Sequence, residues 1–265
     1  MQLAAPFDSL AGDYDRSFST SAIGQTMRTA IWRRTDEAFA PGQRVLELNC
    51  GTGEDALHLA GRGVRVLATD RSPEMLSITR AKVKRAGLDR LVEVAQVPIE
   101  TLANSRDLGP FDGVLSNFGG LNCVEDLPAV SAGLAELLPP GARAMLCLMG
   151  PAVPWEWCWY LARGRPRKAL RRLTRGGTEW HGLTIRYPSV GALRRTFAAH
   201  FIARRVSAIG ALVPPTYAET WAARHPRLLA SLDRWERRIE SVPPLPWLAD
   251  HYLIELERCR DGGGT

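Results

Sequence analysis

The chain has 265 residues, of which 45% are hydrophobic and 23% charged, and its formal net charge is +6. This composition is that of a globular protein and excludes disordered, collagen-like and disulfide-scaffold classes. No uncharged stretch reaches the roughly 18–20 apolar residues of a membrane-spanning helix, and the start of the chain lacks the basic region of a signal peptide. The five cysteines show no CxxC spacing. We therefore expect no metal site and a reduced, cytosolic protein.

Charge and tryptophan are unevenly distributed along the chain. Residues 1–150 contain 15 Lys and Arg against 18 Asp and Glu, whereas residues 151–265 contain 19 against 10. Seven of the eight tryptophans also fall in the second part. Because surface charge bears on partners more than on fold, the two parts are expected to have different tasks.

Short apolar runs alternate with segments of helical period between residues 41 and 150. The runs predict strands over Arg44–Leu48, Val64–Thr69, Val92–Gln96, Gly113–Ser116 and Ala144–Met149. The segments between them predict helices from Glu54, over Ser72–Ala86, and near 98–104 and 127–138. Continuously apolar strands that alternate with helices indicate an α/β protein with a parallel sheet covered on both faces.

The alternation loosens after residue 150. A helix over 189–200 and strands over 201–209 and 251–258 are expected to complete the sheet, which leaves 151–188 and 211–249 as insertions around it. Within the second insertion, apolar residues recur at helical spacing and predict an amphipathic helix over 227–241. The residues of this stripe are Leu228, Leu232, Trp235 and Ile239.

The segment Val45–Ala56 carries the most chemical information. It reads as a buried strand, a turn with Gly51 and Gly53, and the start of a helix. Glycines let a ligand approach the backbone closely, and the N-terminus of the helix offers unpaired N–H groups. Asp70, at the end of the next predicted strand, could accept the hydroxyls of a ribose. The pattern predicts a nucleoside cofactor at the edge of the sheet.

The spacing of Gly51, Gly53 and Ala56 also satisfies the dinucleotide fingerprint, so it does not choose the cofactor by itself. Three features favour S-adenosylmethionine (SAM). Glu47 lies inside the strand before the turn, where a carboxylate suits an ammonium and repels a pyrophosphate. The chain has no Tyr-x-x-x-Lys, and it closes with two strand-like segments where a second mononucleotide-binding half would follow.

Five ordered segments resemble the motifs of class I SAM-dependent methyltransferases, most closely the branch with the ubiquinone and menaquinone biosynthesis enzymes. They are Phe7–Asp15, Val45–Gly53, Ala68–Leu76, Phe111–Phe118 and Leu137–Ala142. The resemblance implies a Rossmann-like, seven-stranded, mostly parallel sheet. Residues 1–40 would be a helical cover and 41–150 the SAM-binding core. Residues 189–210 and 251–258 would end the sheet, and 151–188 and 211–249 would form an inserted acceptor-binding cap.

The resemblance also implies roles for individual residues. Glu47 would line the methionine end, Asp70 would bind the ribose, and Arg71 and Met75 would flank the adenine. The full set implied to bind the cofactor is Tyr14, Glu47, Asn49, Gly51, Gly53, Asp70, Arg71, Met75, Ile99, Ser116, Asn117 and Phe118. Two positions depart from the family pattern. Asn49 replaces a glycine but tolerates left-handed backbone, and Pro98 replaces an Asp that bonds the adenine, so the backbone of Ile99 would read that edge.

The expected reaction is direct displacement of the sulfonium methyl by an acceptor, helped mainly by positioning in a dry pocket. A weakly acidic acceptor also needs a base. Candidates for a catalytic role are Asn117, His181 and His225, with His251 as a further histidine in the same part of the chain. Two alternatives stay open: an NAD(P)-dependent oxidoreductase on a similar sheet, and a SAM-binding protein without turnover.

The remaining conspicuous segment joins tryptophans over 154–160 to seven basic residues within 163–175. It could be a solvated basic face. It could also contact an anionic acceptor or anionic lipid at a membrane surface. Nucleic acid is disfavoured because no known RNA-binding module is recognisable. We expect the acceptor to be a small molecule, apolar or anionic, and the oligomeric state is not predicted.

Overall fold

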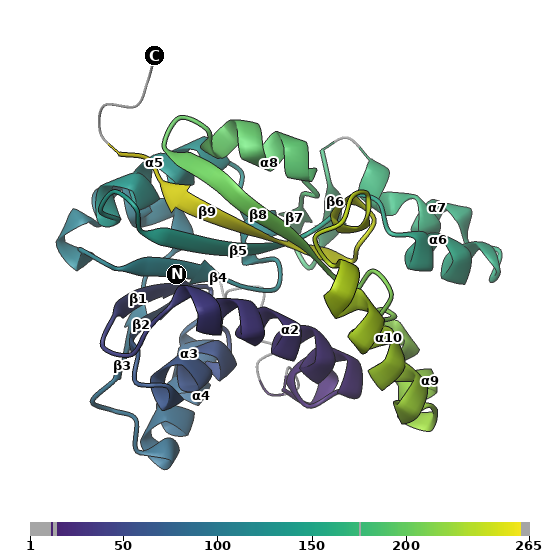
Figure 1. The fold of residues 1–265 in the computed structure, drawn as a ribbon, viewed down its shortest axis with the longest axis horizontal. Helices are drawn as coiled ribbons and strands as arrows, with labels where there is room; N and C mark the ends of the chain where they lie inside the picture. Colours follow the sequence, from purple (N-terminus) through teal and green to yellow (C-terminus); the bar gives the residue numbers. More distant parts are fainter. Residues whose placement is uncertain (1–11, 13–14, 175, 261–265) are drawn as a thin grey trace.

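The computed structural model describes residue 12, residues 15–174 and residues 176–260. At its centre lies a seven-stranded sheet with the strand order β3-β2-β1-β4-β5-β9-β8 (Figure 1). The strands are β1 (Arg44–Leu48), β2 (Arg65–Asp70), β3 (Val92–Gln96), β4 (Gly113–Ser116), β5 (Arg143–Met149), β8 (Phe201–Ile209) and β9 (His251–Arg258). Neighbouring strands from β3 to β5 are parallel, whereas β9 is antiparallel to β5 and β8. The prediction of a seven-stranded, mostly parallel sheet is confirmed, and each predicted strand lies within one residue of its observed bounds.

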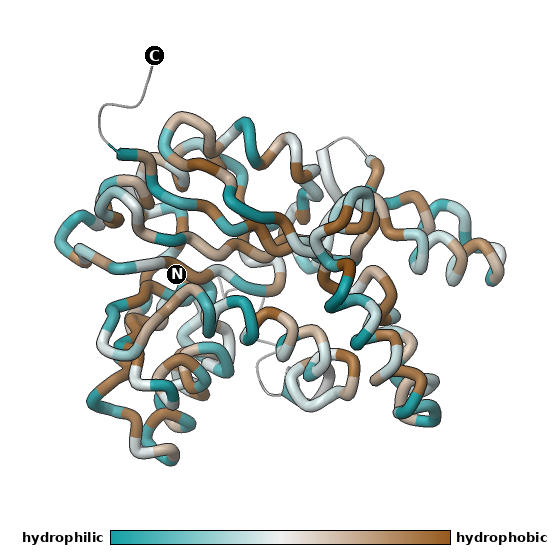
Figure 2. The backbone as a smooth tube through the Cα atoms, in the orientation of Figure 1, coloured by the Kyte–Doolittle hydropathy of each residue, from teal (hydrophilic) through white to brown (hydrophobic). Residues whose placement is uncertain are grey.

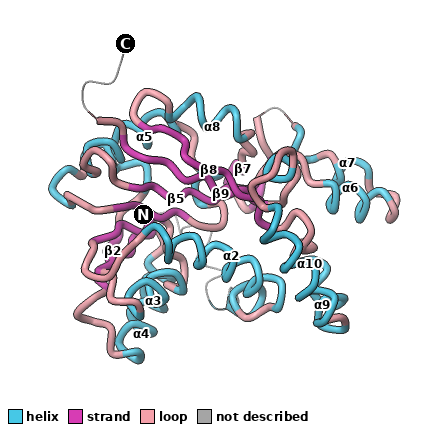
Figure 3. The backbone as a smooth tube through the Cα atoms, viewed as in Figure 1, coloured by secondary structure: helices cyan, strands magenta, loops and turns pink. Residues whose placement is uncertain are grey.

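Helices cover both faces of the sheet (Figure 3). They are α2 (Ala22–Ala38), α3 (Glu54–Gly61) and α4 (Pro73–Ala86) on one face, and α5 (Leu127–Leu137) and α8 (Val190–Phe197) on the other. Successive residues of β1 alternate between the two cores: Val45 packs with the first group of helices, and Leu46 and Leu48 pack with the second. This double burial explains why the inner strands are mostly apolar, with brown stretches along the sheet in Figure 2.

The helix α4 begins at the capping residue that the sequence predicts. Ser72 caps α4 by accepting from the N–H of Met75 at 3.2 Å, and Pro73 occupies the first helical position. The helix expected near 98–104 is instead the 3₁₀ segment η3 (Ile99–Asn104), followed by η4 (Arg106–Leu108).

The two predicted insertions lie together at one end of the sheet, on the right of Figure 1. The first contains α6 (Pro154–Leu161), α7 (Pro166–Ala169), η6 (Arg171–Leu173) and a hairpin of β6 (Thr178–Trp180) and β7 (Leu183–Ile185). The second contains η7 (Thr216–Ala218), α9 (Glu219–Arg224), α10 (Pro226–Ile239) and η8 (Leu245–Trp247). The rings of Trp159 and Tyr217 join the two, with centroids 5.1 Å apart. The hairpin was not predicted, because its strands are only three residues long.

The basic segment of the first insertion is only partly a surface feature. Arg172 is buried and forms ion pairs with Glu156 at 2.8 Å and Asp250 at 2.6 Å. Arg171 also pairs with Glu156, at 2.7 Å. Arg172 thus ties the insertion to the residue before β9. Both arginines have carboxylate partners within the protein, so for these two residues the segment is neither a freely solvated face nor available to an anionic partner. Arg163, Arg167 and Lys168 are exposed.

No helix in the described part of the chain is long and apolar enough to cross a membrane. Nor do three or more His, Cys, Asp or Glu side chains there gather into a group that could hold a metal ion.

Candidate functional site

The turn between β1 and α3 adopts left-handed backbone at three positions. Asn49, Gly51 and Gly53 have φ angles of 49°, 55° and 81°. The prediction that an asparagine can replace the first glycine is confirmed by this geometry. The side chain of Asn49 also links two strands: its amide nitrogen donates to the carbonyl of Asn117 at 3.0 Å, and its amide oxygen accepts from the hydroxyl of Ser116 at 2.8 Å.

Asp70 lies at the end of β2 and holds the same turn from the other side. One oxygen of its carboxylate accepts from the N–H of Gly51 at 3.0 Å, and the other accepts from the N–H of Ser72 at 2.9 Å. Burial raises the pKa of Asp70, and these backbone hydrogen bonds offset part of that rise. A carboxylate has about four lone-pair positions, so it retains capacity for two further donors from a ligand.

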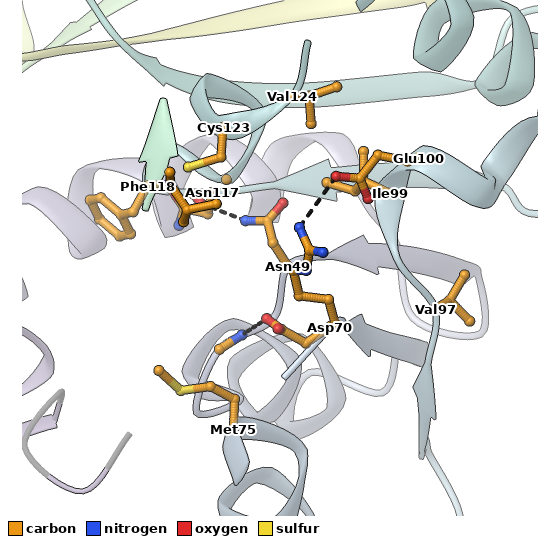
Figure 4. A pocket seen from close by; sticks show the side chains of 14 residues that line it. Asn49, Asp70, Met75, Val97, Ile99, Glu100, Asn117, Phe118, Cys123 and Val124 are labelled. Atoms are coloured by element: carbon orange, nitrogen blue, oxygen red, sulfur yellow. Dashed lines mark hydrogen bonds and ion pairs between the residues drawn. The ribbon is translucent and has the colours of Figure 1, made fainter. Parts of the chain in front are cut away.

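An open cavity lies above Asp70 at the carboxyl ends of β1, β2 and β4 (Figure 4). Its lining is mostly apolar, with polar groups from Asn49, Asp70 and Asn117. The other lining residues are Gly51, Arg71, Met75, Val97, Ile99, Glu100, Phe118, Gly120, Cys123, Val124 and Leu183. Arg71 and Glu100 form a half-exposed ion pair of 3.4 Å beside it. The position matches the general rule that α/β sheets bind ligands where the strand order reverses.

A second, much smaller cavity adjoins the first, because Asn49, Gly51, Asn117 and Phe118 line both. The second cavity is also lined by Arg28, Cys50, Thr52, Glu54 and Asp55.

Asp55 is the centre of a buried polar cluster at this second cavity. Its carboxylate accepts from Arg28 at 2.7 Å, from the indole of Trp32 at 2.6 Å and from the amide of Asn117 at 2.9 Å. Sequence reasoning missed both Arg28 and Asp55. An acidic residue in the first turn of α3 has the ordinary role of complementing the helix dipole, and nothing in the pattern of α2 distinguishes Arg28 from its other arginines.

Glu47 is buried on the same side of the sheet and does not line either of these two cavities. Its Oε2 atom has no hydrogen-bond partner among the described residues. Burial raises its pKa well above the usual range, and the negative charge of Asp55 adds to this effect. A buried carboxylate oxygen without a partner is costly, so this atom fits a site that a positively charged ligand completes.

The N-terminal segment reaches the glycine turn. Asp15, in η2 (Asp15–Ser19), accepts from the hydroxyl of Thr52 at 2.6 Å and pairs with Lys82 at 2.5 Å. The ring of Phe18 packs edge-on against Phe118, with centroids 4.6 Å apart. Tyr14, which the resemblance implies to bind the cofactor, lies outside the described residues.

The proposed catalytic residues are not brought together. Asn117 lies at both cavities, but its side chain is engaged with Asp55 and with the N–H of Phe118. His181 lies in the turn between β6 and β7, and His225 lies at the end of α9; both are exposed and neither lines these cavities.

His251 is placed differently from the other two histidines. It is 7% exposed, and its ring contacts Phe118 edge-on at a centroid distance of 5.6 Å. Its Nδ1 lies 3.1 Å from Asp250. Burial raises the pKa of Asp250, but the charges of Arg172 and His251 outweigh burial and hold it well below its usual range. An ionised Asp250 therefore lies within ion-pair distance of the imidazole, although Nδ1 makes no hydrogen bond to it, and the imidazole is next to a residue that lines both cavities.

These features match known proteins. A family model described as a methyltransferase domain matches residues 45–141, from β1 to the turn before β5. The chain is 36% identical over 157 residues to the demethylmenaquinone methyltransferase of Clavibacter sepedonicus, a match that covers 58% of this chain and 60% of that protein. It is 35% identical over 177 residues to the demethylmenaquinone methyltransferase of Renibacterium salmoninarum, covering 64% of this chain and 70% of that protein.

Among solved structures, the S-adenosylmethionine dependent methyltransferase from Mesorhizobium loti has a TM-score of 0.55 at 20% identity, covering 86% of this chain and 98% of that one. The fold and the matched domain define a Rossmann-like methyltransferase. This chain belongs to the class I SAM-dependent methyltransferases, in the branch related to menaquinone and ubiquinone biosynthesis. The match spans about 60% of the length of the first curated relatives.

Proposed function

We propose that this protein transfers the methyl group of SAM to a small, largely apolar acceptor, and that the acceptor is a reduced demethylmenaquinone or a similar hydroquinone. The observation that carries the proposal is the pair of joined cavities at the carboxyl edge of the sheet. One has apolar walls and Asp70, and the other has the buried Arg28–Asp55 pair. The acceptor class comes from the names of the curated relatives.

The larger cavity fits the adenosine part of SAM. Asp70 has acceptor capacity left for the ribose hydroxyls, as the motif resemblance implies. Arg71, Met75 and Ile99 line the same cavity and supply the surfaces that an adenine ring requires. The left-handed turn at Gly51 leaves open space where a side chain would otherwise project.

The polar groups of the smaller cavity suit the methionine part. The guanidinium of Arg28 suits the carboxylate of this group, and the carboxylate of Asp55 suits its ammonium. Glu47 does not line this cavity, but its carboxylate interacts electrostatically with Asp55 and would attract the ammonium at longer range. Asn117, held by Asp55, and Phe118 would lie between the two parts, where the sulfonium belongs.

Bound SAM supplies an electrophilic methyl group on a positively charged sulfur. A hydroquinone becomes nucleophilic at a ring carbon when it loses a hydroxyl proton, so the protein must accept that proton and exclude water. We assign the proton to His251, because the ionised Asp250 lies 3.1 Å from its Nδ1 and would stabilise the imidazolium that forms. Phe118, which contacts this imidazole, would form the wall between the base and the methyl group.

The two insertions would form the acceptor-binding cap. Leu183 of the hairpin already lines the larger cavity, and Gly182, Leu183, Thr184 and Arg186 line an adjoining groove. The exposed Arg163, Arg167 and Lys168 would contact an anionic group if the acceptor carries one. Arg171 and Arg172 are excluded from this role by their ion pairs.

The test is methyl transfer from labelled SAM to a reduced demethylmenaquinone with a short side chain. We expect turnover in the parent protein and a loss of about 100-fold or more in kcat in His251→Gln, with unchanged affinity for S-adenosylhomocysteine. His225→Gln is the matched control, since it makes the same chemical change on an exposed residue away from these cavities. Equal kcat in the two variants would show that His251 is not the base.

The two other classes predict different results. An oxidoreductase would bind NADH, but the antiparallel β9 departs from the sheet of two parallel mononucleotide-binding halves, and every match above is a methyltransferase. A SAM-binding protein without turnover would bind S-adenosylhomocysteine but transfer no label to any fraction of a cell extract.

A further inference from the structure

Three of the four residues in the apolar stripe of α10 are exposed to solvent, and Leu232 is half-buried. Leu228, Trp235 and Ile239 are 46%, 58% and 37% exposed. Val242 and Trp247, in the segment that follows the helix, are 53% and 39% exposed. An amphipathic helix on a globular protein normally turns its apolar stripe toward the core, so this helix is inverted. Helices α9 and α10 form the lower right edge of the molecule in Figure 1.

The opposite face of α10 is what the fold buries, and it combines Leu229 with the carboxylates of Asp233 and Glu236. The carboxylate of Glu236 accepts from the N–H groups of Gly210 at 2.7 Å, Leu212 at 2.6 Å and Val213 at 2.9 Å. One turn further on, the buried Glu240 pairs with Arg33 of α2. If the helix rolled to bury its apolar stripe, both carboxylates would lose their partners. The outward orientation of the stripe is therefore held in place by buried hydrogen bonds and ion pairs.

A row of exposed arginines runs beside the stripe. Arg227, Arg234 and Arg238 recur at helical spacing, and the guanidinium of Arg238 lies 5.0 Å from the centre of the Trp235 ring. Among the described residues, no carboxylate lies within ion-pair distance of these three arginines. The exposed surface of α10 thus combines an apolar stripe, a tryptophan and a row of positive charge.

We propose that α10 binds the surface of an anionic lipid bilayer. Leu228, Trp235 and Ile239 would enter the boundary between headgroups and acyl chains, and the arginine row would contact lipid phosphates. The combination of apolar stripe and basic flank is that of helices lying in the membrane interface. A second copy of this chain is a poorer occupant, because pairing two such helices would bring two arginine rows together. The proposal does not depend on which acceptor the site methylates.

The test measures binding to sedimented vesicles of phosphatidylglycerol and phosphatidylcholine and to vesicles of phosphatidylcholine alone. Two triple variants separate the two contributions: a stripe variant, Leu228→Gln with Trp235→Gln and Ile239→Gln, and a row variant, Arg227→Gln with Arg234→Gln and Arg238→Gln. Matched controls are Ile202→Gln, an exposed apolar residue on β8, and Lys84→Gln with Arg85→Gln and Arg90→Gln, which removes the same charge near α4.

We expect the parent to bind the anionic vesicles and the stripe variant to bind about tenfold or more weakly. At low salt, the affinity of the row variant for anionic vesicles should fall by up to about fivefold for each arginine replaced. At high salt the decrease should be smaller. Both controls should bind like the parent, and every variant should keep the parent affinity for S-adenosylhomocysteine. That last measurement distinguishes failure of this proposal from failure of the proposed function.

Two results would overturn the proposal. One is a parent protein that does not bind anionic vesicles, or a stripe variant that binds them as well as the parent. The other is a dimer in sedimentation that the stripe variant loses, without vesicle binding by the parent, which would assign the stripe to a second copy.

Discussion

Replacing Asp70 by Asn is expected to weaken binding of S-adenosylhomocysteine about tenfold to a hundredfold. Two of the four lone-pair positions of the carboxylate are occupied by the N–H groups of Gly51 and Ser72, which leaves two for the ribose hydroxyls. The amide removes the charge and turns one acceptor into a donor. A hydrogen bond to a charged group contributes about 1.5–3 kcal/mol, and each 1.4 kcal/mol is a tenfold change in affinity.

The assay is isothermal titration with S-adenosylhomocysteine and with its analogue lacking both ribose hydroxyls. If Asp70 binds the ribose, the parent should bind the analogue more weakly than S-adenosylhomocysteine. Asp70→Asn should bind the two ligands with nearly equal affinity, because it has already lost the contact that the analogue lacks. The two changes are then coupled. Asp89→Asn is the control: Asp89 is exposed and precedes β3 at the opposite edge of the sheet. Because Asp70 also holds the turn, thermal unfolding of each variant is measured in parallel. Equal losses for the analogue in parent and variant would refute the ribose assignment.

Three further predictions concern charge and metal. Burial raises the pKa of Glu47, and a ligand ammonium would favour its ionised form. Binding should then release a proton and tighten with rising pH by up to about tenfold per unit, and titrations from about pH 6 to 8 should show no such trend in Glu47→Gln. Arg172→Met should lower the free energy of unfolding by up to about 3–5 kcal/mol in denaturant, because it removes a cationic partner from two buried carboxylates, which keep only Arg171 and His251. Since the folded-state pKa of Asp250 is depressed, its contribution is present above the unfolded pKa and is lost as pH falls, so Arg172→Met should flatten the acid limb of the stability curve. Methyl transfer should be unchanged by a chelator, and activity abolished by EDTA and restored by one divalent ion would contradict this.

The amino-acid sequence alone determined the sheet and the larger cavity. Strands with two buried faces must be continuously apolar, and this signal is local, so every strand of the large sheet was placed within one residue. The turn at Asn49, Gly51 and Gly53 is equally local, because few residues adopt left-handed backbone without strain. The position of Asp70 beside this turn could also be predicted, because the carboxyl ends of parallel strands meet at one edge of the sheet. These features could be predicted because they depend on residues close together in the chain and on the regular alternation of strands and helices.

Which residues line the smaller cavity, and which residues of the insertions are exposed, depends on contacts between segments far apart in the sequence. These features therefore became visible only in the tertiary structure. The Asp55 cluster joins Arg28 to Asn117, which lie 27 residues before and 62 residues after it in the sequence, and no periodicity records such contacts. Arg172 belonged to a basic run, yet its pairing with Asp250, 78 residues later, buries it. The period of α10 predicted its apolar stripe correctly but not the direction in which that stripe points. That direction was decided by the partners of Glu236 and Glu240, because a buried carboxylate that loses its hydrogen bonds costs more than an exposed leucine.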